Sequence, residues 1–177
     1  MQVELGALEF RKKSGTTAQE RALTEALVLE HLERYLLIEE ILGLDSATWK
    51  APFPPRLVRS FADAENVATK AREEWNLGDG PILNTTELRE EHGIKVMMLP
   101  LPAGLSGLTC LVERPGATPV PVIVVNEKRN LEQQRLALLR ELGHRLMRAE
   151  GIDEEKAAHR FAGAFLMPAG HVRAQVG

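Results

Sequence analysis

The stretch that decides the fold is Arg135-Leu136-Ala137-Leu138-Leu139-Arg140-Glu141-Leu142-Gly143-His144. It lies in a run from Leu131 to Ala149 that has no proline and is rich in helix-forming residues, so we expect one helix there. Residues four positions apart share a helix face, so Arg140 and His144 are expected to project from the same side.

A helix that holds a catalytic zinc ion carries two histidines four residues apart, and both imidazoles then reach one metal ion. A glutamate directly after the first histidine acts as general base toward the metal-bound water. Glu141 and His144 occupy the second and last positions of that pattern, but Arg140 occupies the first. A guanidinium stays protonated in proteins and cannot donate a lone pair to zinc. Taken alone, the pattern also fits an amphipathic helix with a stray histidine.

Further segments flank this helix in a definite order. They are Pro81–Asn84, Glu90–Val96, Leu105–Leu108, Val122–Asn126 and Glu155–Pro168, the last containing Phe161-Ala162 and ending in Met167-Pro168. Together with the Glu141 helix, these segments resemble the ImmA/IrrE family of zinc peptidases, from about Ser60 to Met167. Members of that family are often fused to, or encoded beside, helix-turn-helix regulators of the XRE type.

The resemblance implies a role for four residues. It places the catalytic glutamate on Glu141, the second zinc histidine on His144, and the third ligand, a glutamate of the next helix, on Glu155. The first zinc histidine falls on Arg140. Zinc is therefore the cofactor that the family implies, and Arg140 argues against zinc in this chain.

Two residues, Arg140 and His159, leave alternatives open. Arg140 is either a surface charge with weak pairing, or it fills the vacated metal cavity and neutralises Glu141 or Glu155. Its shared face with His144 favours the second interpretation. His159, four residues after Glu155, is either a polar packing residue or a substitute for the missing metal ligand.

The remaining sequence predicts an α+β fold, with a small twisted sheet packed against the zincin-like helix and a long helical arm before it. Strands are expected at Ile94–Leu99, at Leu105–Glu113 with a break at Gly107, and at Pro121–Asn126, where the apolar run indicates a central strand. Helices are expected from Ser60 to Trp75, from Asn84 to His92 and from Asp153 to Met167. Cys110 is expected to be a buried apolar residue.

The domain plan follows from prolines near residue 52. We expect residues 1–50 to form a helical arm, with one helix from about Thr17 to the C-capping Gly43. Residues 51–59 are expected to form a proline-rich linker, and residues 60–177 the peptidase-like domain. The arm has a wide apolar stripe of Ala22, Leu23, Ala26, Leu27, Leu29, Leu32, Leu36 and Ile41. This stripe either covers its own domain or pairs in a coiled coil, and we expect a homodimer through residues 17–43.

The composition limits which partners and which cellular location we expect for this protein. The net charge of −3 gives no basic field for nucleic acid, and DNA would be reached only through a domain that is not visible here. The single cysteine, the absence of a signal-peptide pattern at the start, and the lack of a long apolar run predict a cytoplasmic protein without membrane association.

Three functions remain as hypotheses. The first is a regulatory protein with a degenerate, zinc-deficient peptidase domain, acting in transcriptional or stress regulation through a ligand or protein partner such as an XRE-type regulator. The second is an active zinc metalloprotease that cleaves a repressor-type regulator. The third is a toxin–antitoxin component, which the resemblance allows and no residue favours.

Overall fold

The computed structural model describes residues 4–5, 16–44, 48–113 and 118–168. The chain divides into two compact units, each built from two separate stretches. The first unit combines Met1–Lys50 with Thr86–Gln134, and the second combines Ala51–Thr85 with Arg135–Gly177. The described residues form both helices and strands, which confirms the predicted α+β fold class.

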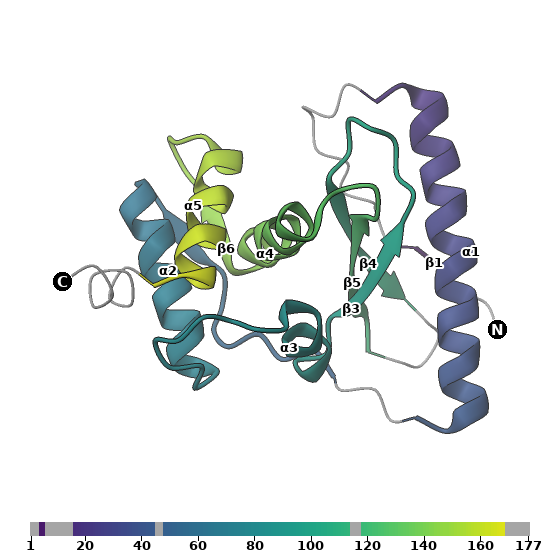
Figure 1. Ribbon diagram of the computed structural model, residues 1–177, viewed down its shortest axis with the longest axis horizontal. Helices are drawn as coiled ribbons and strands as arrows, with labels where there is room; N and C mark the ends of the chain where they lie inside the picture. Colours follow the sequence, from purple (N-terminus) through teal and green to yellow (C-terminus); the bar gives the residue numbers. More distant parts are fainter. Residues whose placement is uncertain (1–3, 6–15, 45–47, 114–117, 169–177) are drawn as a thin grey trace. The chain divides into compact units, whose positions relative to one another are not determined.

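The first unit contains, within the described residues, a four-stranded sheet. Its order is β1 (Glu4–Leu5), β4 (Gly107–Glu113), β5 (Val120–Asn126) and β3 (Lys95–Leu99), with α3 (Thr85–Glu91) leading into β3 (Figure 1). β5 pairs with β4 in antiparallel and with β3 in parallel orientation. The prediction that the apolar run of β5 forms a central strand is therefore confirmed.

A buried amide at the end of β5 organises the loop that connects β3 and β4. The Nδ2 group of Asn126 donates to the carbonyl oxygens of Leu101, Pro102 and Leu105 at 3.2, 3.2 and 2.8 Å. Its Oδ1 atom accepts a hydrogen bond from the backbone of Lys128. These bonds satisfy both ends of a side chain that is withdrawn from water, as a buried polar group requires.

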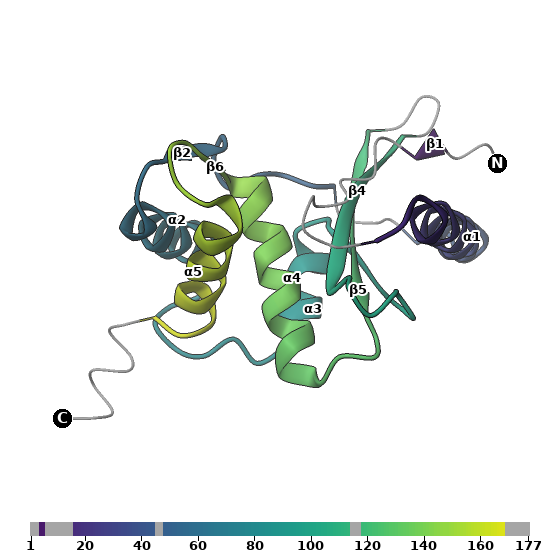
Figure 2. The same ribbon diagram turned by 90° about the horizontal axis from the view of Figure 1, so that it is seen from above.

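The N-terminal helix α1 (Ala18–Leu42) lies along this sheet (Figures 1 and 2). Thr17 and Glu20 form a capping box at its start, and Gly43, in the left-handed conformation, ends it as expected. The helix buries Thr24, Val28, Leu32 and Leu36. The three apolar side chains join a core with residues of β3, β4 and β5, which includes the buried Cys110. Of the apolar stripe expected on this helix, Leu32 and Leu36 are buried against the sheet, whereas Leu23 and Ile41 are exposed.

The second unit pairs two helices beside a short parallel ladder. β2 (Arg56–Val58) pairs with β6 (Met147–Ala149), and α2 (Phe61–Glu74) packs on α5 (Glu154–Leu166). Alanines fill much of the buried surface of both helices, which allows their backbones to approach closely. The rings of Phe161 and Phe165 stack at 5.6 Å. Helix α4 (Leu131–Leu146) begins in the first unit and continues in the second.

Some predicted boundaries need correction. The helix expected to reach Ala149 ends at Leu146, because residues 147–149 extend to form β6 with β2, a strand inside the predicted linker. The strand expected from Leu105 begins at Gly107, where a Cβ would stand 2.9 Å from the Val124 carbonyl oxygen. The division into residues 1–50, 51–59 and 60–177 stays a prediction, and positions 169–177 lie outside the described residues.

None of the helices in the described part of the chain combines the length and hydrophobicity needed to cross a bilayer.

Candidate functional site

The candidate site lies on two helices of the second unit. α4 carries Arg140, Glu141 and His144 in its C-terminal half. α5 starts at the N-cap Asp153, whose carboxylate accepts from the Lys156 backbone, and it presents two glutamates in its first turn. Carboxylates are favoured at this end of a helix because the helix dipole places positive partial charge there.

An ion pair joins the two helices at this position. The Nη2 group of Arg140 donates to Glu155 Oε2 at 3.1 Å, and the two side chains are 22% and 30% exposed. The structure therefore brings together the residues that were expected at the first and third zinc-ligand positions. The surface-charge and the cavity-filling interpretations of Arg140 both stay predictions.

His144 lies beside the same pair. Its imidazole is only 3% exposed, with Nδ1 3.1 Å from Glu154 Oε1 and Nε2 3.6 Å from Glu155 Oε1. A protonated imidazole would face a carboxylate on each side, whereas a neutral one donates from a single nitrogen. Glu154 was not singled out from the sequence, although its place next to Glu155 in the first turn of α5 was the available signal.

The two other predicted site residues differ in exposure. Glu141 is almost fully buried, and His159 is exposed on α5. Within the described ranges, no three or more histidine, cysteine, aspartate or glutamate side chains form a group that could hold a metal ion. Nitrogen atoms of His144 do approach carboxylate oxygens of Glu154 and of Glu155.

Gly143 explains how α4 and α5 come close enough for these contacts. A Cβ at this position would lie 2.8 Å from Cδ1 of Phe161, closer than real Cβ contacts allow. Phe161 is fully buried and stacked on Phe165, so its ring has little room to shift. The glycine between Glu141 and His144 is therefore a packing requirement that sequence reasoning missed.

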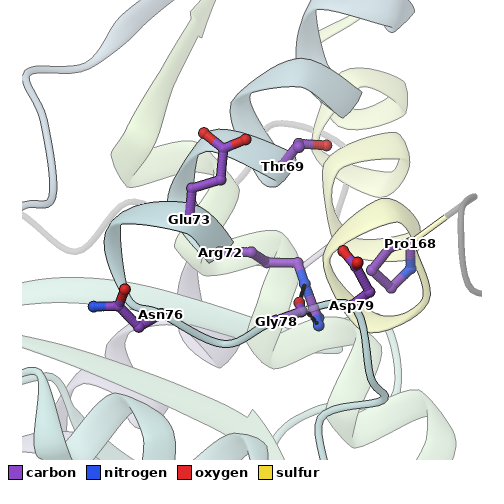
Figure 3. Close-up of a pocket in the computed structure, with 7 residues that line it drawn as sticks. All are labelled: Thr69, Arg72, Glu73, Asn76, Gly78, Asp79 and Pro168. Atoms are coloured by element: carbon purple, nitrogen blue, oxygen red, sulfur yellow. Dashed lines mark hydrogen bonds between the residues drawn. The ribbon is translucent and has the colours of Figure 1, made fainter.

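A separate pocket of about 450 Å³ opens in the second unit. Its lining residues are Thr69, Arg72, Glu73, Asn76, Gly78, Asp79 and Pro168 (Figure 3). The buried Arg72 donates to the carbonyl oxygens of Gly78 and Gly80 and, at 2.5 Å, to that of Phe165. Burial lowers the pKa of Arg72, and Asp79 opposes this shift. The guanidinium thus fastens the loop after α2 to the end of α5, which gives it a structural role.

Comparison with known proteins gives one result for the family. Residues 89–176 match the Peptidase_M78 family, the IrrE N-terminal-like domain. No curated protein and no solved structure matches the chain. The matched segment starts within α3 and includes Arg140, His144 and Glu155, so the resemblance inferred from the sequence is confirmed. This chain contains a domain of the ImmA/IrrE type.

Proposed function

We propose that this protein is a degenerate member of its family, in which an arginine–glutamate ion pair takes the place of the catalytic zinc. The observation that carries the proposal is the 3.1 Å contact between Arg140 and Glu155. The domain then acts by binding a protein or a ligand, in transcriptional or stress regulation. An XRE-type DNA-binding regulator is the partner that the family suggests.

The chemistry of the donor set supports the loss of zinc. A catalytic zinc ion usually has three protein ligands and an open position for water. Arg140 supplies a fixed positive charge where the first ligand would be, and it engages one oxygen of Glu155. A divalent cation at that place would be repelled by the guanidinium and would find His144 and Glu155 as its donors. The residues present therefore do not fit a catalytic zinc site.

An active metalloprotease that cleaves a repressor-type regulator is the second candidate. The observation that favours it is the orientation of His144, whose Nε2 atom faces Glu155 Oε1 at 3.6 Å. These two atoms are the donors that a zinc ion would need from α4 and α5. In that case, Arg140 would have to leave Glu155 before metal binds.

Zinc content and a restored ligand distinguish these candidates. The purified wild-type chain is expected to contain no stoichiometric zinc, and added zinc should leave its melting temperature unchanged. Arg140→His restores the four-residue spacing with His144, so zinc should raise the melting temperature of this variant by mass action. Arg160→His serves as the control, because it adds a histidine at an exposed position of α5.

About one zinc ion per wild-type chain, retained after mild chelation, would overturn the proposal and support the protease. If Arg140→His responds to zinc no more than Arg160→His does, the assignment of residue 140 to the first ligand position is wrong.

A further inference from the structure

Helix α1 has a second apolar face, opposite to the one that covers the sheet. The buried face carries Val28, Leu32 and Leu36, whereas Leu23 and Ile41 are 64% and 72% exposed. Leu37 is also exposed on the outer side. Scattered exposed leucines are ordinary, but these side chains recur along one line of one helix.

The spacing along this outer face is that of a coiled coil. The residues are Leu23, Leu27, Glu30, Arg34, Leu37 and Ile41, separated alternately by four and three positions. This alternation is the repeat of the a and d positions, which forms a continuous seam along a helix. Leu27 also touches the core of the unit, so the seam borders the buried face at that point.

The centre of the seam is charged. Glu30 and Arg34 pair within the helix at 2.5 Å and both are well exposed, while apolar side chains lie on each side of them. Charges at a and d positions reduce stability but specify how two helices align. The pattern is apolar, charged, apolar, and it is nearly symmetric about residue 32.

We infer that α1 pairs through this seam with α1 of a second copy, in antiparallel orientation. A two-fold axis near residue 32 places Leu23 opposite Ile41 of the partner subunit, and Leu27 opposite Leu37 of the partner subunit. It also places Glu30 opposite Arg34 of the partner subunit. Parallel pairing would put each of these charges opposite an identical one, which is unfavourable. Charge complementarity therefore selects a second copy of this chain in the antiparallel arrangement.

This inference is independent of zinc and of the proposed function. It concerns the outer face of α1, which contributes none of the candidate site residues. The inner face can stay on its own sheet, so dimerisation requires no unfolding of the first unit. Both alternatives that the sequence leaves open for the arm then hold at once, one on each face of the helix.

The oligomeric state tests the existence of the interface. Sedimentation equilibrium on the full chain is expected to show a concentration-dependent dimer. Ile41→Glu should raise the dissociation constant at least about tenfold, since it places a carboxylate in the apolar seam. Leu83→Glu, at a strongly exposed leucine of the second unit, is the matched control and should leave the dimer unchanged.

Charge reversal and cross-linking test the orientation. Glu30→Arg alone should weaken the dimer, and the double exchange of Glu30→Arg with Arg34→Glu should restore it. Under oxidising conditions, Leu23→Cys and Ile41→Cys variants should each remain uncross-linked alone and form a disulfide only when mixed. Along one helix these positions lie about 27 Å apart, so like positions of an antiparallel pair cannot meet.

A monomer at every concentration would overturn the inference, as would a dimer that Ile41→Glu leaves intact. Efficient self-cross-linking of the Leu23→Cys variant would show a parallel pair and would overturn the antiparallel arrangement.

Discussion

The ion pair between α4 and α5 should measurably stabilise the second unit. At the observed 3.1 Å, Coulomb attraction between Arg140 and Glu155 is about 5 kcal/mol at an effective dielectric constant of about 20. Ordering and desolvating two long side chains offsets most of this energy. Their partial exposure places the net coupling between exposed pairs and fully buried ones, at about 1–2 kcal/mol.

A double-mutant cycle isolates this coupling from other effects of the substitutions. Arg140→Met and Glu155→Gln remove the charges with little change in volume, and chemical denaturation of the four proteins gives the four free energies of unfolding. For a chain of this size, the coupling corresponds to a shift in melting temperature of about 2–8 °C. The control cycle uses Arg160→Met and Glu65→Gln, a pair at 3.3 Å whose side chains are 61% and 46% exposed. Its coupling should stay below about 0.5 kcal/mol.

The reasoning fails if the Arg140–Glu155 coupling is no larger than that of the control pair. Such a result would mean that the contact is a solvated surface pair, and the argument that it replaces a metal ion would lose its energetic basis. A coupling of the expected size together with zinc binding by the wild-type chain would support one claim and refute the other. The ion pair would then stabilise the second unit, but the protein would not have lost its zinc.

Three other substitutions test the packing and electrostatics of the units. Gly143→Ala should lower the free energy of unfolding by about 1–3 kcal/mol, because its Cβ would overlap the ring of Phe161. The control Gly163→Ala has open space around its Cβ and should be neutral or stabilising. Arg72→Lys should destabilise by about 1.5–3 kcal/mol in urea denaturation, because a lysine cannot serve three carbonyl groups in the same fork geometry. Burial lowers the pKa of His92, so as the pH falls the unfolded chain binds a proton at this imidazole before the folded chain does. The free energy of unfolding should therefore decrease as the pH falls through about 6.5. Melting curves between pH 8 and pH 5 should show a smaller decrease in melting temperature for His92→Gln than for the wild type.

The sequence predicted the elements whose signals are local. Ser60 and Gly43 mark helix ends because a capping side chain or a left-handed residue acts within a few positions of itself. The apolar run of β5 indicated a strand buried in the middle of a sheet, since such a run has no polar face to present to water.

Other features depend on contacts between distant parts of the chain. β2 and β6 are three-residue strands that exist because each supplies backbone partners to the other, about 90 residues away. Residues 147–149 read as helix from their own composition, and pairing with β2 overrides that preference. The role of Gly143 also depends on a distant contact, because only the packing of Phe161 against this position excludes a Cβ there.

The candidate site divides in the same way. The order of residues along the chain predicted the family, because motif identity and helical spacing are properties of the sequence alone. The assignment of Glu141, His144 and Glu155 to site positions, and of Arg140 to a ligand position, rests on the same order and stays a prediction. Only the tertiary structure decided that Arg140 pairs with Glu155, and that Glu154 joins His144. The sequence left Glu141 and Glu155 open as partners of the guanidinium, and the choice between them depends on how closely α4 and α5 approach each other. That approach is fixed by packing, which no local pattern specifies.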